Sequence, residues 1–260
     1  MVCLTRRPIP ALCEFVEYLW LLSARRHSLE RILPSSTLEL VVNLCEDEIR
    51  IHDNAGTHSK RFTGMVVSGV YGTFFVIDTA EHALTMGVHV RTGGAHSILG
   101  IPAIELADAH VDVQALWGQA ASELRERLCL AITHEQHFML LENALLFRAE
   151  RATEHNGAVD FAARALRQRG ARVRDIARQV GMSHRRLIEL FAAQVGMNPK
   201  LYGRVNRFQR ALCVARQQRV KDWGQLALEC GYYDQSHLIH DFSTFSGFTP
   251  AGTRNRRTTS

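Results

Sequence analysis

The chain has 260 residues, of which 46% are hydrophobic and 22% charged, and these values are typical of a globular protein with one large or two ordinary domains. No apolar run approaches the roughly 20 residues that a membrane span requires. The first residues also lack the apolar segment of a signal peptide. We therefore expect a cytoplasmic protein without a membrane partner.

The six cysteines are scattered along the chain and form no CxxC pair. Cys213 and Cys230 fall on the apolar faces of predicted helices, which indicates reduced, buried cysteines. The spacing does not suggest a disulfide framework or a zinc site.

The net charge of +5 is unevenly distributed. Residues 155–260 contain 18 Lys and Arg against 7 Asp and Glu, a net charge of +11, whereas residues 1–154 contain 13 against 19, a net charge of −6. A basic domain joined to an acidic one is typical of a nucleic-acid-binding protein with a separate accessory domain.

Residues 1–118 are predicted to form a β-rich domain. Residues 8–22 are apolar enough for either a short amphipathic helix or an early strand, and both alternatives stay open. Further on, short β-type runs separated by turns favour a sandwich or small barrel, followed by a short helix and a loop up to residue 118. The predicted strands are 38–44, 48–52, 65–70, 74–77 and 83–90.

Residues 119–154 are predicted to be a helical connector that ends in a polar linker at 154–157. Leu124, Leu128 and Ile132 mark one helical face, and a second apolar set follows. These positions fit an intramolecular core and a dimer interface equally well. The second set consists of Phe138, Leu141, Leu145 and Leu146.

Residues 155–260 open with a helix at about 158–169, in which Phe161, Ala165 and Leu166 are expected to face the core, and then contain an internal repeat. Apolar residues at 173, 176, 177 and 180 recur at 223, 226, 227 and 230, with a shift of 50 that becomes 51 further on. This spacing predicts one helical face in each copy.

In each copy a glycine turn follows the first helix. Gly181 and Gly231 stand where a left-handed residue ends a helix, and Ser183 and Asp234 are suitable N-caps for a second helix. Each copy therefore predicts a helix-turn-helix, whose second helix fits the DNA major groove. A continuous helix beginning at Pro199 is expected to join the two copies rigidly.

This region resembles the DNA-binding domain of AraC/XylS-family transcription regulators over residues 158–256. The residues that carry the resemblance lie in both copies, and the second copy, from Gly231 to Phe242 with Gly247-Phe-Thr-Pro250 and Arg254, is similar to the second motif of that family. The first copy contributes Asp175-Ile-Ala177, Gly181-Met-Ser183, Arg185, Leu187, Phe191 and Gly196-Met-Asn-Pro199.

The resemblance implies an α+β protein with a cupin-like or small-barrel N-terminal sensor, a helical connector and an all-α double helix-turn-helix domain. It also implies a sequence-specific, nucleoid-associated transcription regulator that places two recognition helices in adjacent major grooves of promoter DNA. The N-terminal domain would sense a small-molecule effector or mediate homodimerisation, and an activator would also contact RNA polymerase.

Eight outward-facing side chains of the two recognition helices are predicted to contact bases. Arg185 suits guanine, Gln235 suits adenine, and Glu189 could accept from cytosine or orient an arginine. His240 fits a base or a phosphate contact equally well. The eight are His184, Arg185, Ile188 and Glu189 in the first helix, and Gln235, Ser236, Ile239 and His240 in the second.

Phosphate contacts are expected from a further set of basic residues, with help from backbone N–H groups at helix starts. These basic residues are Arg172, Arg174, Arg204, Arg207 and Arg254.

No catalytic motif is found, and we expect no enzyme activity, metal or other cofactor. The segment Val88-His-Val-Arg91 supplies one histidine where a metal-binding cupin has two. Two alternatives remain: a DNA-binding alkyl-transferring repair enzyme, for which Cys3 and Cys13 are too few to form a zinc-activated cluster, and an architectural DNA-binding protein without an effector.

Overall fold

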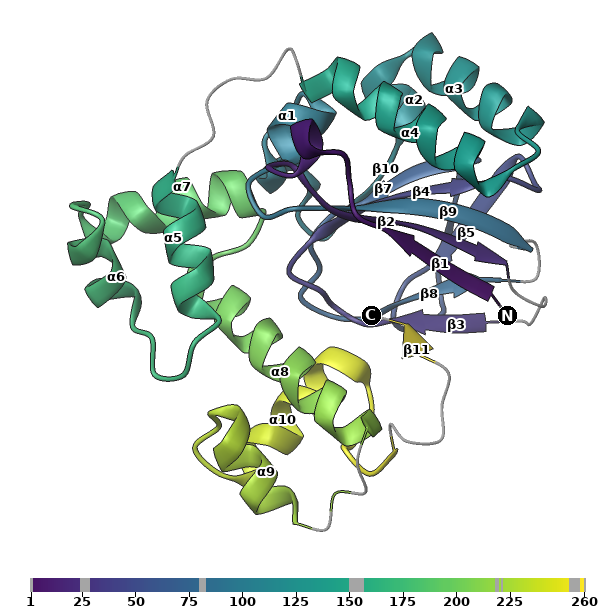
Figure 1. Cartoon of the computed structure of the whole chain (residues 1–260). Coiled ribbons are helices and arrows are strands. Elements are labelled where there is room, and N and C mark those ends of the chain that lie inside the picture. The colour runs from purple at the N-terminus through teal and green to yellow at the C-terminus, as the bar shows by residue number, and fades with distance from the viewer. Residues whose placement is uncertain are drawn as a thin grey trace.

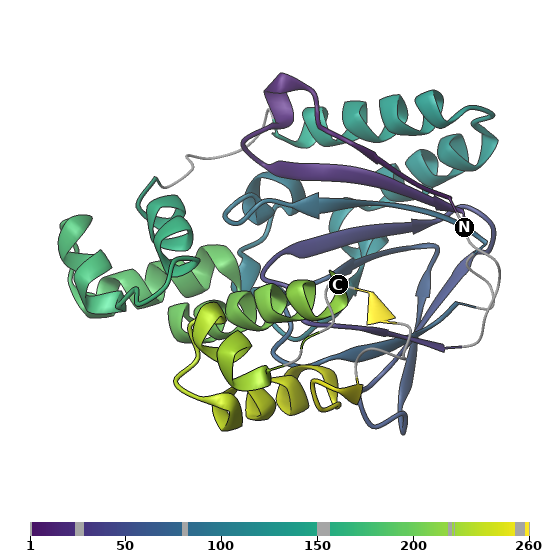
Figure 2. The same cartoon turned by 60° about the horizontal axis from the view of Figure 1, so that its bottom comes forward.

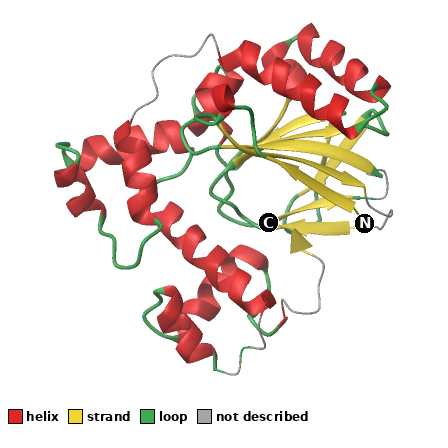
Figure 3. Cartoon of the chain, viewed as in Figure 1, coloured by secondary structure: helices red, strands yellow, loops and turns green. Residues whose placement is uncertain are grey.

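The computed structural model describes residues 2–23, 29–79, 83–149, 157–217, 220, 222–252 and 258–259. The chain forms a β-rich N-terminal part with a layer of helices on one side and an all-helical C-terminal part (Figure 1). Figure 3 shows the same division by secondary structure. Among the described helices none is long and apolar enough to cross a membrane. These observations confirm the predicted α+β class.

Two sheets build the N-terminal part (Figure 2). In the six-stranded sheet the order is β1 (Val2–Arg6), β2 (Val16–Ser23), β9 (Leu84–Val90), β4 (Leu38–Asn43), β7 (Met65–Ser68) and β10 (His110–Asp112). In the five-stranded sheet the order is β11 (Thr258–Thr259), β3 (Leu29–Ile32), β8 (Phe75–Asp78), β5 (Glu48–His52) and β6 (Ser59–Thr63).

All five predicted strands are present, and the structure decides the open alternative at residues 8–22. A 3₁₀ turn, η1 (Pro10–Leu12), precedes β2, so the strand interpretation holds for 16–23. Strand β11 pairs in parallel with β3, which returns the end of the chain to the N-terminal part.

Alternation along the six-stranded sheet sends one set of side chains toward a helical layer and the other toward the second sheet. Leu19, Leu40 and Val88 lie on the helix-covered face and are fully buried. The helices that cover this face are α1 (Ala95–Leu99), α2 (Val113–Trp117), α3 (Gln119–Leu130) and α4 (His134–Ala149).

The segment predicted as a connector consists of two helices that pack on the β-rich part. Leu128 and Leu141 are fully buried in its core, so this apolar face is intramolecular. Ile132 was expected on the same face and is instead 90% exposed, because the helix breaks at 131–133. A capping box causes the break: the Gln136 backbone N–H donates to Thr133 Oγ1, and Gln136 Oε1 accepts from the Thr133 N–H.

Six helices form the C-terminal part: α5 (Gly157–Leu166), α6 (Val173–Gln179), α7 (His184–Val195), α8 (Pro199–Gln217), α9 (Trp223–Cys230) and α10 (Gln235–Ser246). Two expectations about burial are wrong. Phe161 is 39% exposed, because α5 buries Val159, Ala162, Ala163 and Leu166. Cys213 is exposed, as are the other cysteines except Cys230, and all six are free thiols.

The N-terminal part contacts the C-terminal ends of both recognition helices. Gly196 ends α7, and a Cβ added there would lie 2.6 Å from Val70 Cγ2; Gly247 ends α10, and a Cβ there would lie 2.7 Å from Phe74 Cε1. The Arg31 guanidinium lies 4.4 Å from the Phe74 ring centroid and donates to the Ser246 carbonyl at 2.9 Å. Gly196 and Gly247 occupy equivalent positions in the repeat, so the two recognition helices contact the N-terminal part in the same way.

We expect Leu141→Ala to lower the free energy of unfolding by about 2–5 kcal/mol, because it empties a fully buried site between α4 and the sheet. Leu130→Ala is the matched control, because Leu130 is 79% exposed, and it should change the unfolding free energy by less than about 0.5 kcal/mol. Urea denaturation measures both; equal small effects would contradict the packing of α4 on the β-rich part.

Candidate nucleic-acid interface

The first helix-turn-helix consists of α6 and α7. Gly181 has φ +68°, the left-handed conformation expected at the turn, and the Met182 N–H donates to the Ala177 carbonyl at 2.9 Å. Ser183 Oγ then accepts from the Arg186 N–H at 3.1 Å and caps α7. The predicted turn and cap of this unit are confirmed.

The second unit, α9 and α10, repeats this geometry. Gly231 has φ +86°, and the Tyr232 N–H donates to the Ala227 carbonyl at 2.8 Å. This hydrogen bond lies 50 residues after the equivalent one from Met182 to Ala177. Asp234 caps α10 by accepting from the His237 N–H at 2.8 Å. The internal repeat in the sequence is therefore a repeat of backbone hydrogen bonds.

Helix α8 joins the two units as a single 19-residue segment. Its Tyr202 ring packs edge-on against Phe191 of α7 at 5.2 Å, and its Phe208 ring packs edge-on against Phe242 of α10 at 5.0 Å. All four rings are fully buried. Each recognition helix is therefore fixed to the same rod by an aromatic contact.

The eight predicted base-contacting residues all retain accessible surface. His184, Arg185 and Glu189 are exposed, whereas Ile188 is half-buried, and in α10 Ile239 is half-buried too. The other three of α10, which are Gln235, Ser236 and His240, are exposed. Because the C-terminal ends of both helices face the N-terminal part, the N-terminal ends, which carry these residues, project away from it (Figure 1).

Arg185 and Glu189 form an ion pair on the exposed face of α7. Arg185 Nε lies 2.8 Å from Glu189 Oε1, one helical turn away, and this hydrogen bond raises the pKa of Arg185. The geometry favours the second of the two predicted roles for Glu189, in which it orients the arginine.

Four of the five predicted phosphate-contacting arginines fall into three groups. Arg172 and Arg174 are exposed at the start of α6, where a helix N-terminus also favours an anion. Arg207 is half-buried, with its guanidinium 5.4 Å from the Tyr232 ring centroid. Arg254 lies outside the described residues.

Arg204 has a structural role that differs from the predicted phosphate contact. Its Nη2 lies 2.6 Å from Asp241 Oδ1, and the Asp241 side chain is fully buried. The Arg204 guanidinium also lies 5.2 Å from the Phe245 ring centroid. Arg204 therefore neutralises a buried carboxylate between α8 and α10, and its phosphate contact stays a prediction. Asp241 likewise points into the core.

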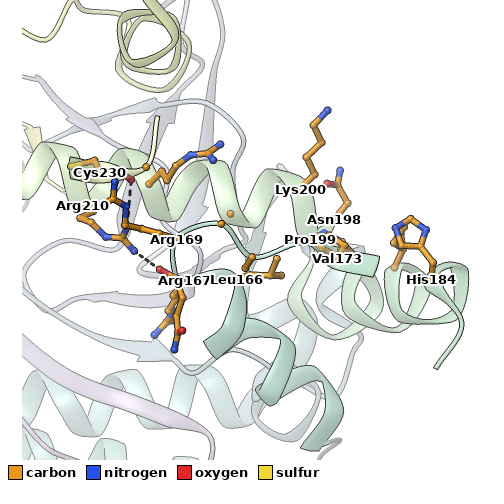
Figure 4. A pocket seen from close by; sticks show the side chains of 17 residues that line it. Leu166, Arg167, Arg169, Val173, His184, Asn198, Pro199, Lys200, Arg210 and Cys230 are labelled. Carbon is orange, nitrogen blue, oxygen red and sulfur yellow. Dashed lines mark hydrogen bonds between the residues drawn. The ribbon is translucent and has the colours of Figure 1, made fainter. Parts of the chain in front are cut away.

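A cleft of about 740 Å³ separates the two helix-turn-helix units (Figure 4). Its walls come from the α5–α6 loop, α7, α8 and the end of α9, and they include His184 and Ile188 of the predicted base-contacting set. The walls also carry five cationic side chains: Arg167, Arg169, Lys200, Arg207 and Arg210.

Two of these arginines connect the units through helix C-termini. Arg210 of α8 donates to the carbonyl of Arg167 at the end of α5 and to the Cys230 carbonyl at the end of α9. Arg169 donates to the Leu228 carbonyl of α9. Unpaired carbonyls at helix ends carry partial negative charge, so cations there are stabilising. Our sequence analysis missed Arg169 and Arg210, although basic residues just after or facing a helix end are the signal to look for.

Within the described ranges no group of three or more His, Cys, Asp or Glu side chains is arranged to hold a metal ion.

A helix-turn-helix domain family matches residues 160–256, and a domain of unknown function (DUF6597) matches residues 4–112. A search of curated proteins finds no match. Apo ToxT from Vibrio cholerae is 11% identical, with a TM-score of 0.51 over 97% of this chain and all of that chain. ToxT with a bound unsaturated fatty acid is 12% identical, covering 98% and 96% of the chains with a TM-score of 0.48. The C-terminal domain of AraT, a response regulator from Geobacillus stearothermophilus, is 17% identical, covering 42% and 92% with a TM-score of 0.38.

Arg204→Ala should lower the free energy of unfolding by about 3–5 kcal/mol, because it leaves the Asp241 carboxylate buried without its cation. Arg178→Ala breaks an exposed ion pair with Asp175 and should cost at most about 1 kcal/mol. Thermal and chemical denaturation would compare the two variants. Similar stability of both would mean that Arg204 is available for DNA after all.

Proposed function

We propose that the chain is a DNA-binding transcription regulator in which α7 and α10 read two adjacent major grooves of one promoter segment, and the helix-turn-helix family match over residues 160–256 supports this proposal. The N-terminal part then acts as a sensor that sets the position of these helices. The observation that supports the proposal best is the attachment of both recognition helices to α8 through buried rings.

The length of α8 suits this arrangement. Its 19 residues correspond to about 28 Å at 1.5 Å per residue, and successive major grooves on one face of DNA lie about 34 Å apart. Arg210 and Arg169 hold the two units together at the cleft and so help to fix their spacing. A rigid spacing means that one protein molecule reads two segments together rather than independently.

Base reading is assigned to the exposed side chains at the N-terminal ends of the two helices. We propose that Arg185, oriented by Glu189, donates to guanine O6 and N7, and that Gln235 pairs with adenine N6 and N7. The half-buried Ile188 and Ile239 suit contact with thymine methyl groups. The polar residues His184, Ser236 and His240 complete the set.

Affinity is assigned to the phosphate backbone. The net charge of +11 on residues 155–260 supplies the attraction, and Arg172 and Arg174 at the start of α6 are the phosphate contacts that the geometry supports best. Arg207 would join them only after leaving the Tyr232 ring.

Regulation is proposed to act through the contacts at the helix ends. Val70 meets Gly196 and Phe74 meets Gly247, and Thr73 Oγ1 donates to the Thr244 carbonyl at 3.3 Å. A ligand that shifts the loop at residues 70–74 would therefore move both recognition helices together. Dimerisation is the second proposed role of the N-terminal part, favoured by exposed apolar residues on its helical layer, which are Leu130, Ile132 and Met139.

Arg185→Ala should cost about 1–3 kcal/mol of specific binding free energy and relax the preference at one base pair, because a bidentate contact to guanine is lost. The experiment is selection of bound sequences from random duplexes, followed by competition binding. Arg127→Ala, an exposed residue of α3, is the control and should leave both affinity and preference unchanged. An identical base preference in wild type and Arg185→Ala would exclude the proposed role.

Inserting five base pairs between the two segments of the selected site should weaken binding at least about tenfold, because it rotates one segment by half a turn away from a rigid protein. Electrophoretic mobility shift would measure the loss. Tolerance of the insertion would show that the two units move independently and that α8 does not fix their spacing.

A further inference from the structure

A row of polar side chains crosses the six-stranded sheet on the face that looks toward the second sheet. The register pairs Tyr18 with His89, His89 with Glu39, Glu39 with Ser68, and Ser68 with His110. Directly paired residues in an antiparallel sheet share one face. The row therefore runs across five strands, from β2 to β10, on the inner face of the sandwich.

Glu39 is the centre of the accessible end of this row. Its Oε1 accepts a hydrogen bond from Trp20 Nε1 at 2.8 Å and lies 3.1 Å from His89 Nε2. The Tyr18 ring stacks on the His89 ring with centroids 4.3 Å apart, and Thr37 Oγ1 lies 3.4 Å from His89 Nδ1. A carboxylate thus stands among aromatic rings, with both observed donors on one of its oxygens.

The inner face is more accessible here than the helix-covered face. The Glu39 side chain is 24% exposed and that of His89 is 11% exposed, whereas Leu19, Leu40 and Val88 on the opposite face are fully buried. Tyr18 and Trp20 are half-buried as well. Solvent can therefore reach part of the Glu39 and His89 side chains.

The far end of the row is closed. His110 packs against the rings of Tyr71 at 4.7 Å and Phe75 at 4.5 Å, and its Nδ1 lies 3.0 Å from Ser68 Oγ. Burial lowers the pKa of His110 to about 3, so this histidine is neutral at physiological pH. The far end of the row therefore carries no charge.

A neighbouring row on the same face carries no charged side chain across β2, β9, β4 and β7. It pairs Trp20 with Gly87, Gly87 with Val41, and Val41 with Val66, all apolar residues. A partly buried carboxylate and histidine are often no more stabilising than apolar side chains of the same size. Glu39 and His89 therefore need an explanation other than stability.

The placement of Trp20 makes an aromatic surface beside the carboxylate. A Cβ on Gly87 would lie 2.5 Å from Trp20 Cζ2, so the indole occupies the space of the missing side chain and rests against the sheet. Trp20 orients the Glu39 carboxylate through its indole N–H, and its half-buried ring contributes apolar surface beside the carboxylate.

We propose that Tyr18, Trp20, Glu39 and His89 form a binding site for a small organic cation, an amine or quaternary ammonium compound. Glu39 neutralises the charge, and the aromatic rings contact the carbon atoms around it. The net charge of −6 on residues 1–154 also favours a positively charged ligand. The inference rests on the proposed sensor role of the N-terminal part and assigns the class of effector. Fatty acids, by contrast, would place a carboxylate against Glu39.

The test is calorimetric titration of the full-length protein with choline, agmatine and tyramine, with oleate as the anionic probe and tryptophan fluorescence as a second readout. At least one cation should bind with a Kd below about 1 mM, and oleate should not bind at this site. Glu39→Gln should weaken cation binding at least tenfold. Glu48→Gln on β5 is the matched control, with a glutamate side chain 32% exposed, and should leave it unchanged.

Trp20→Phe provides a second variant should Glu39→Gln fail to fold by circular dichroism, and it should weaken cation binding several-fold. The proposal is overturned when none of the three cations binds wild type, when cation binding survives both substitutions undiminished, or when oleate binds and the cations do not. DNA binding is measured separately on the same preparations. If the wild-type protein binds a cation but does not bind DNA, the proposed function is overturned while the proposed cation site is retained.

Discussion

The attachment of two recognition helices to one continuous helix is the constraint on which the C-terminal part depends. Tyr202 holds Phe191 on one side of α8, and Phe208 holds Phe242 on the other. Because α8 is a regular helix, its length converts these local ring contacts into a fixed separation. Arg210 adds a second connection by donating to the ends of both α5 and α9.

The N-terminal part lies against both of these rigidly joined helices. It contacts the repeat at the same place twice, at the left-handed glycine that ends each recognition helix. The absence of a Cβ at Gly196 and Gly247 lets Val70 and Phe74 approach the backbone directly. A loop that touches two rigidly joined helices can act on both with one displacement, which simple proximity of two separate domains would not allow.

Much of this architecture could be predicted from the sequence, because repeats and helical periodicity are local signals. Both turns, at Gly181 and Gly231, and both caps, at Ser183 and Asp234, were predicted and are confirmed. The AraC-type helix-turn-helix domain was likewise identified and is confirmed over 160–256. The β-rich character of the N-terminal part followed from five short β-type runs separated by turns, of which residues 48–52 alternate between apolar and polar side chains.

Long-range pairing was not predictable in the same way. The ion pair of Arg204 with Asp241 was not predicted, because Asp241 is 37 residues away and the two side chains meet only when α8 and α10 pack. The polar row needed the register of five strands before Tyr18, Glu39 and His110 could be placed together. The exposure of Ile132 was missed because the Thr133–Gln136 capping box was not recognised, although that signal is local.

Strand β11 brings the end of the chain back to the N-terminal part. Its two residues lie parallel to β3, so the polypeptide that leaves the N-terminal sandwich after α4 comes back to it after α10. The C-terminal part is therefore connected to the N-terminal part at both of its ends, through the chain that follows α4 and through the pairing of β11 with β3. Two connections restrict the rigid-body motion of the C-terminal part more than one connection would, and they favour small rotations over separation of the two parts.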